Sequence, residues 1–164
     1  MSENQWIEKL AIQDLCARYC HTIDSQDSTG WAQCFTPDGI FEFDGWAIRG
    51  RPALTEYADV QARVMRCRHL TVNCLYEISG DQATGRSTTV VTLATEGGYK
   101  IFGQGAYEDR LVKDYGRWQI ALRRVRTDRL VTDPEKLVNQ ADPDVAALVR
   151  HLVEAAQRLA QRVE

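Results

Sequence analysis

The sequence predicts an α+β protein in which helices come first and long antiparallel strands follow. Through residues 4–65, apolar side chains recur mainly at three- and four-residue spacing, which is typical of helices. From residue 69 to residue 127 the period changes to two, with short polar turns between the runs, which is typical of strands. Helices and strands that are segregated along the chain favour an α+β fold over a βαβ one.

Three helices are predicted in the first part of the chain. Residues 4–25 form an amphipathic helix whose apolar stripe consists of Ile12, Leu15, Cys16, Tyr19, Cys20 and Ile23. A polar turn over residues 25–30 leads to a short helix that carries Trp31, Cys34 and Phe35. A third helix opens at Gly50, since Pro52 is tolerated in a first turn. Its apolar positions are Leu54, Tyr57, Ala58, Ala62 and Met65.

A strand is predicted between the second and third helices, and four longer ones after the third. Residues 36–39 indicate a turn, and residues 39–44 a strand with Phe41 and Phe43 facing inward. The later strands are predicted at residues 69–78, 83–95, 99–113 and 117–127. Tight turns join these four strands, so we expect an antiparallel meander.

The end of the chain differs in character, which predicts a division into residues 1–130 and residues 131–164. The Asp-Pro pairs at 133–134 and 142–143 mark a polar connection. Residues 143–163 form a helix with Asp142 as N-cap, and its apolar residues step alternately by four and three. Such a stripe either pairs with another protomer or packs on its own sheet. We expect a homo-oligomer, a dimer or trimer, with this helix as a candidate contact.

Composition limits the possible partners. The net charge is −3 and the pI about 5.7, so nucleic acid is not an expected partner. No segment reaches the roughly 18 uninterrupted apolar residues of a membrane span, and the N-terminus has no cationic stretch leading into an apolar run. We therefore expect a cytoplasmic protein that does not bind membranes. Five cysteines without a C-x-x-C spacing argue against disulfides and a zinc site.

The segment from Arg68 to Asn73 carries polar side chains on one face of a predicted strand. His69, Thr71 and Asn73 share that face, and Leu70, Val72 and Cys74 share the other. The polar face either meets water or lines an internal pocket. Asp24 lies one turn after Cys20, at the edge of the first helix's stripe, where a buried carboxylate is permitted. His21 falls opposite the stripe and is expected in solvent.

Several motifs together resemble the SnoaL-like group of the nuclear transport factor 2-like superfamily. These motifs span residues 6–128. The first consists of residues 11–15 together with Tyr19 and Asp24, and the others are residues 35–39, 50–54, 68–73, 105–111 and 117–121. The resemblance implies a cone in which a curved mixed, largely antiparallel sheet wraps the N-terminal helices and encloses an apolar pocket.

Within that superfamily, the chain is most similar to scytalone dehydratase and hexachlorocyclohexane dehydrochlorinase. These enzymes pair an aspartate at the end of the first helix with a histidine after the third, positions held here by Asp24 and His69. Asn73 also matches the dehydrochlorinase pattern. The resemblance implies a small lyase without a cofactor. The sequence departs from it in lacking a second pocket histidine and in carrying Tyr19 where the dehydrochlorinase has lysine.

The residues themselves support proton abstraction. His69 is a natural base near neutral pH, and Asp24 would orient its ring and stabilise the imidazolium. Tyr19 could donate to a developing enolate oxygen, while Asn73 and Tyr107 could orient the substrate. Candidates for an apolar wall that selects a hydrophobic, cyclic substrate are Phe35, Phe41, Trp46, Tyr57 and Met65. Asp24 and His69 supply only two metal ligands, so no metal is expected.

Two other functions fit the sequence. A ketosteroid-isomerase-like isomerase or cyclase would use Tyr19 with a carboxylate at Glu42 or Asp44 as base. A non-catalytic scaffold, like the β-subunits of ring-hydroxylating dioxygenases, would have a pocket filled by side chains. In that case His69 and Asp24 would form a structural pair.

Overall fold

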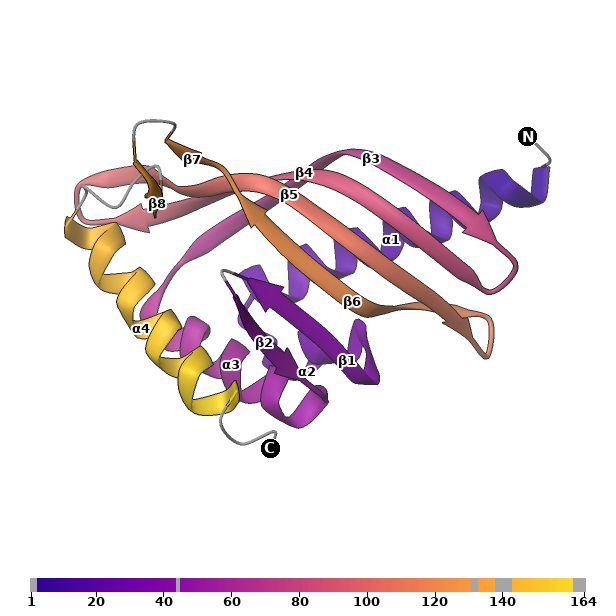
Figure 1. The fold of residues 1–164 in the computed structure, drawn as a ribbon, viewed down its shortest axis with the longest axis horizontal. Helices are drawn as coiled ribbons and strands as arrows, with labels where there is room; N and C mark the ends of the chain where they lie inside the picture. The colour runs from indigo at the N-terminus through magenta and orange to yellow at the C-terminus, as the bar shows by residue number, and fades with distance from the viewer. Residues whose placement is uncertain (1–2, 44, 131–132, 138–142, 161–164) are drawn as a thin grey trace.

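The computed structural model describes residues 3–43, 45–130, 133–137 and 143–160. The helices are α1 Glu3–Asp24, α2 Ser28–Gln33, α3 Arg51–Val64 and α4 Pro143–Ala160. The strands are β1 Phe35–Phe43, β2 Trp46–Arg49, β3 Cys67–Ser79, β4 Gln82–Thr95, β5 Gly98–Asp114, β6 Arg117–Thr127, β7 Arg129–Leu130 and β8 Asp133–Leu137. Figure 1 shows the long strands β3 to β6 side by side, with α1 running along them.

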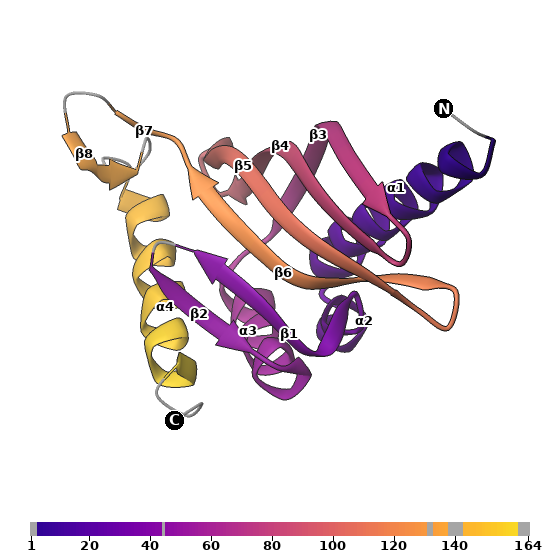
Figure 2. The same ribbon diagram turned by 45° about the vertical axis from the view of Figure 1, so that its right-hand side comes forward.

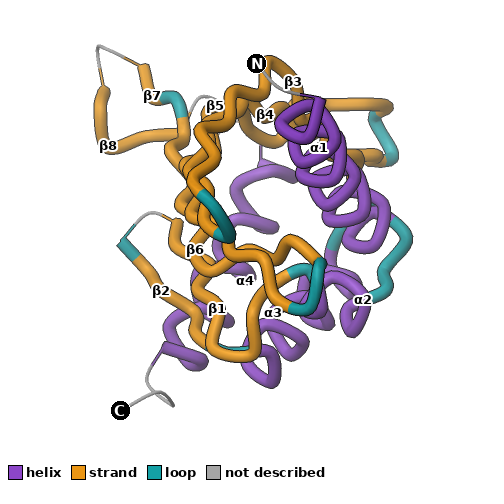
Figure 3. Tube along the Cα trace, turned by 90° about the vertical axis from the view of Figure 1, so that its right-hand side faces the viewer, coloured by secondary structure: helices purple, strands orange, loops and turns teal. Residues whose placement is uncertain are grey.

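The main sheet is mixed, as predicted. Its strand order is β2-β1-β6-β5-β4-β3, and every neighbouring pair is antiparallel except β1 with β6. That parallel pair places Phe41 beside Arg123 and Phe43 beside Val125. The helices α1, α2 and α3 gather on one side of the curved strands (Figure 3). The predicted α+β architecture, with N-terminal helices, a curved mixed sheet and an additional C-terminal helix, is confirmed.

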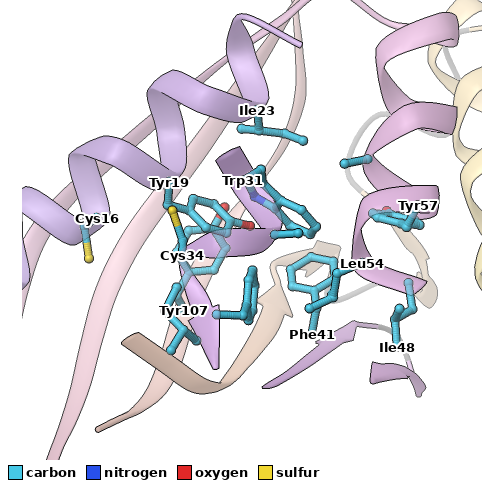
Figure 4. Packing of buried hydrophobic residues seen from close by; sticks show 14 of the residues in the cluster. Cys16, Tyr19, Ile23, Trp31, Cys34, Phe41, Ile48, Leu54, Tyr57 and Tyr107 are labelled. Atoms are coloured by element: carbon cyan, nitrogen blue, oxygen red, sulfur yellow. The ribbon is translucent and has the colours of Figure 1, made fainter. Parts of the chain in front are cut away.

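The core lies between this sheet and the helices. The predicted stripe of α1 is buried, with Ile12, Leu15, Tyr19 and Ile23 at most 4% exposed. Aromatic side chains from α1, α2, β1 and α3 gather in this core (Figure 4). Ring contacts with centroids 5.1–6.4 Å apart join Trp31, Phe35, Phe41 and Tyr57. Offset and edge-on contacts at such distances add stability beyond the area that is buried.

The turn predicted at residues 36–39 is wrong, because these residues belong to β1. Phe35 pairs with Ile120 and Ile40 with Leu122, so an irregularity between them absorbs the additional residues. Gly39 is required there, since a Cβ at this position would lie 2.8 Å from Phe35 Cβ and 2.9 Å from the Ile120 carbonyl oxygen. The strand β2 was not predicted; four residues are too few for periodicity to identify.

The C-terminal part also contains more structure than expected. The residues predicted as a polar connection include the strand β8, which pairs antiparallel with β7. Helix α4 begins at Pro143 as predicted, while its proposed N-cap Asp142 lies outside the described residues. Its apolar stripe packs on α3 and β2 of the same chain (Figure 2), burying Val145, Leu152, Ala156 and Leu159. Of the two alternatives for this stripe, the structure favours packing within the chain. None of the described helices is long and apolar enough to cross a membrane.

Candidate functional site

His69 and Asp24 form a hydrogen-bonded pair at the junction of α1 and β3. His69 Nδ1 lies 2.7 Å from Asp24 Oδ1, and the backbone N–H of His69 donates to Oδ2 at 2.9 Å. The Arg68 guanidinium donates to the backbone carbonyl of Asp24 at 3.1 Å, which ties the end of α1 to β3. The two side chains are only 10% and 8% exposed. The predicted pairing of these residues is therefore present in the structure.

The pairing determines which ring nitrogen can act as a base. An imidazole beside a carboxylate donates through Nδ1–H, and the other nitrogen, Nε2, then carries the lone pair. The carboxylate also stabilises the imidazolium that forms when Nε2 takes up a proton. The pair can thus accept a proton from a molecule held on the Nε2 side of the ring.

An apolar cavity of about 130 Å³ adjoins His69. A dry cavity of about 150 Å³ accepts a benzene-sized molecule, so this one suits a small ring. None of the described residues that line it is Asp, Glu, Lys or Arg. The lining comes from helices and strands throughout the fold: Tyr19, Ile23, Trp31, Phe41, Phe43, Tyr57, Gln61, Met65, His69, Thr89, Val91, Phe102, Gly103, Gln104, Tyr107, Val125, Thr127, Val149, Leu152 and Val153.

Besides Asp24 and His69, eight residues were predicted to contact the substrate, and most of these line the cavity while three do not. Tyr19, Tyr107, Phe41, Tyr57 and Met65 all line it. The exceptions are Phe35, Trp46 and Asn73.

Phe35 and Trp46 belong to the packing around the cavity. Phe35 is fully buried, with its ring centroid 5.1 Å from that of Trp31, which itself lines the cavity. Trp46 lies on β2 at the edge of the sheet and packs, half-buried, against the core. Both aromatic residues therefore support the wall without being part of it.

Asn73 lies in an exposed groove between α1 and β3 because the strand is irregular at this point. The β3–β4 register shifts between Val72 and Leu75, and Asn73 has a left-handed backbone with φ 54°. A bulge breaks the two-residue alternation, so Asn73 does not continue the inward face that begins at His69. The opposite face is also more open than its apolar residues suggest, with Leu70 53% and Val72 47% exposed.

Several wall residues were not identified from the sequence. The most prominent are Trp31 on α2, Thr89 on β4 and the α4 residues Val149, Leu152 and Val153. The stripe of α4 was recognised, but a stripe does not say what it covers. Thr89 faces inward between the buried residues Ser87 and Leu93, on a strand whose polar content concealed its burial.

Two tyrosines, Tyr19 and Tyr107, are part of the wall. The Tyr19 ring meets the His69 ring edge-on with centroids 6.5 Å apart, and the Tyr107 ring lies 5.9 Å from that of Tyr19. Burial raises the pKa of Tyr19 well above its usual range and that of Tyr107 to about 12. Both phenols therefore stay protonated at neutral pH and can donate hydrogen bonds.

The thiol of Cys67, a group that can also bind a metal ion, lies next to Asp24 and His69. Its Sγ lies 3.8 Å from Asp24 Oδ1 and 3.9 Å from His69 Nδ1. Ligands of a tetrahedral zinc are roughly 3.3 Å apart when both are nitrogen or oxygen. The 2.7 Å between Asp24 and His69 is that of a direct hydrogen bond, too short for an ion between them. Burial, then the Asp24 charge, raise the pKa of the Cys67 thiol to about 11.

The carboxylate required by an isomerase-like site is engaged elsewhere. Glu42 accepts hydrogen bonds from Arg124 Nε at 2.6 Å and Nη2 at 3.0 Å, which lower its pKa. It is not among the residues that line the cavity. The other candidate, Asp44, lies outside the described residues.

Comparison with known proteins places the chain in a family. A family model described as SnoaL-like domain matches residues 6–124. Rv3472, a protein of unknown function from Mycobacterium tuberculosis whose structure was solved as a variant, is 67% identical. The alignment covers 96% of this chain and 93% of that one, with a TM-score of 0.94. No curated protein matches.

Two solved structures from Novosphingobium aromaticivorans share the fold at lower identity. One is an NTF2-like protein with a cystatin-like fold, 22% identical over 89% of this chain and 91% of that one, with a TM-score of 0.71. The other is a candidate scytalone dehydratase, 23% identical over 79% of this chain and 89% of that one, with a TM-score of 0.72. The matched model and the 67% identical relative show that this chain belongs to the SnoaL-like domain family.

Proposed function

We propose that the protein is a small enzyme that removes a carbon-bound proton from an uncharged, hydrophobic ring compound. The observation that carries this proposal is the 2.7 Å contact between His69 Nδ1 and Asp24, which leaves Nε2 as the basic nitrogen of a ring that lines the adjoining cavity. Elimination, isomerisation and ring closure all begin with this step. A lyase of the dehydratase type is the form we favour, because the chain resembles a candidate scytalone dehydratase.

Each residue of the proposed site has a defined task. His69 takes the proton, and Asp24 stabilises the imidazolium and holds the ring. Tyr19 and Tyr107 donate to the oxygen on which negative charge develops, and the apolar wall excludes water. This chemistry is complete without a cofactor or metal.

A general base in an apolar cavity can be tested without knowledge of the natural substrate. The probe is 5-nitrobenzisoxazole, from which a base removes the carbon-bound proton while the nitrogen–oxygen bond breaks, giving a nitrile and a coloured phenolate. We expect saturable turnover that falls about 10²–10⁴-fold in His69→Ala, the range of general-base contributions.

The other two histidines serve as matched controls. His21 and His151 are exposed, so His21→Gln and His151→Gln should turn over the probe like the wild type. Equal rates in His69→Ala and the wild type would exclude His69 as the base. A protein without turnover that instead forms a stable complex with another polypeptide would be the scaffold of the alternative hypothesis.

A further inference from the structure

Arg123 is a charged side chain buried behind the cavity wall. It lies on β6 and has no exposed surface. Its Nε and Nη2 donate to the two carboxylate oxygens of Asp109 at 2.9 and 2.7 Å. A buried ion pair adds little net stability, because desolvation offsets most of the attraction. Stability alone therefore does not account for this pair.

The same guanidinium contacts two rings of the cavity wall. Arg123 Cζ lies 4.2 Å from the ring centroid of Tyr19 and 4.3 Å from that of Tyr107. Both tyrosines line the cavity, whereas Arg123 does not. Its Nη1 has no hydrogen-bond partner among the described residues. A cation over an aromatic face is attracted to the ring and draws its electron density.

The strand register places both members of the ion pair behind the cavity wall. On β5 and β6, Tyr107 lies opposite Val125, and Asp109 lies opposite Arg123. Tyr107 and Val125 line the cavity, so Asp109 is one inward-facing position farther away. Arg123, opposite Asp109, lies at the same level, and its guanidinium contacts the two tyrosine rings of the wall.

We infer that Arg123 is a positioning residue that fixes Tyr19 and Tyr107 and strengthens their hydroxyls as donors to an anionic oxygen of the ligand. This inference rests on the proposed function and specifies its ligand: a neutral ring compound that becomes an enolate or phenolate when bound. Burial raises the pKa of both phenols, and the Arg123 charge acts in the opposite direction. The hydroxyls stay protonated but are stronger donors than uncharged surroundings would make them.

The test is the binding of 4-nitrophenol, whose neutral and anionic forms differ in absorbance. The affinity of each form, measured over a range of pH, gives a preference for phenolate over phenol. The variants are Arg123→Met combined with Asp109→Leu, which removes both charges at similar volume, and Arg123→Lys, which keeps the charge. Removing only one partner would leave an unpaired buried charge, so the two are replaced together.

We expect the combined variant to fold and to lose about tenfold of the phenolate preference, while neutral 4-nitrophenol binds with unchanged affinity. Arg123→Lys should keep the preference within about threefold. In the background of Tyr19→Phe with Tyr107→Phe, removal of the two charges should have no further effect, because Arg123 acts through the hydroxyls. An unchanged preference in the folded combined variant would overturn the inference.

A second comparison applies even where the combined variant does not fold. If the wild type and Tyr19→Phe with Tyr107→Phe show the same phenolate preference, the tyrosines do not act as donors and Arg123 has nothing to position. Binding is measured without turnover, and every variant keeps His69 and Asp24. If the wild type prefers the phenolate but does not turn over 5-nitrobenzisoxazole, the result contradicts the proposed function and leaves the role of Arg123 standing.

Discussion

His69 holds the Asp24 carboxylate with two different parts of the same residue. Its backbone N–H donates to Oδ2 at 2.9 Å, and its ring Nδ1 meets Oδ1 at 2.7 Å. The backbone contact fixes the carboxylate relative to β3, and the carboxylate in turn fixes the ring. The ring therefore cannot rotate away from the cavity without losing a short, nearly buried hydrogen bond.

Replacing Asp24 with asparagine should damage the proposed catalysis while preserving the shape of the site. The amide of Asp24→Asn can donate a hydrogen bond to Nδ1, so the ring proton would lie on Nε2. Nε2 could then no longer act as the base. We expect turnover of 5-nitrobenzisoxazole to fall by about 10²-fold or more, with a smaller change in KM. Unchanged turnover in a folded Asp24→Asn protein would mean that the carboxylate has only a structural role.

The cavity can be closed at Gly103 without disturbing its wall. A Cβ at this position would meet no atom within 4 Å, and Gly103 lies beside the inward-facing Val91. Gly103→Val should therefore place its methyl groups in the cavity. We expect the melting temperature to be unchanged or a few degrees higher, because an apolar group fills a void.

Ligand binding in Gly103→Val should fall at least about tenfold, measured with 4-nitrophenol. Gly97→Val is the matched control, since it places the same side chain in the β4–β5 turn, away from the cavity. Equal binding by both variants would show that the cavity is not the binding site.

How far the sequence could predict the site depended on the regularity of each element. The α1 stripe and the start of β3 follow simple periods, which predict the faces of Tyr19 and His69. The pairing of Asp24 with His69 came from the family resemblance and not from these periods. The face of Asn73 could not be predicted, because a bulge is a local backbone irregularity that a two-residue pattern does not reveal.

The deeper parts of the site depend on contacts between elements that are distant in the sequence. Arg123 reads as one of several charged residues in a strand, and only the β5–β6 register brings it to Asp109. Which element α4 would cover was likewise open, because a helical stripe specifies a buried face and not its partner. Val149 and Leu152 could therefore not be assigned to the cavity from the pattern alone.

Glu8 should make the stability of the fold depend on pH. It accepts hydrogen bonds of 2.7 Å from both Lys113 and the Trp118 indole, which lower its pKa. Because the pKa of Glu8 is lower in the folded protein than in the unfolded chain, where it is about 4.3, ionised Glu8 stabilises the fold at pH values above 4.3. This stabilisation is lost as the pH falls through the pKa of the folded state. Glu8→Gln should cost about 1–2 kcal/mol at pH 7, measured by urea unfolding.

The difference between Glu8→Gln and the wild type should shrink on acidification, until the two proteins are equally stable once Glu8 is protonated. Asp14→Asn is the control, since Asp14 pairs with Arg18 on the exposed side of α1. Exposed pairs contribute little, so we expect less than about 1 kcal/mol there. A Glu8→Gln penalty that stays constant down to low pH would show that packing, not charge, is responsible.

Cys67 should report the charge of Asp24 through its reactivity. With a pKa of about 11, roughly one thiol in a thousand is ionised at pH 8, so alkylation by iodoacetamide should be slow. The negative Asp24 contributes to this raised pKa, and Asp24→Asn should therefore lower it and speed the labelling of Cys67 severalfold.

Cys34 is a matched control, since burial raises its pKa to about 11 without any contribution from Asp24. Peptide mapping of both cysteines over a pH series separates the two sources of slow reaction. Faster labelling of Cys67 alone indicates the lost charge, whereas equal acceleration at both cysteines indicates general loosening and contradicts the electrostatic explanation.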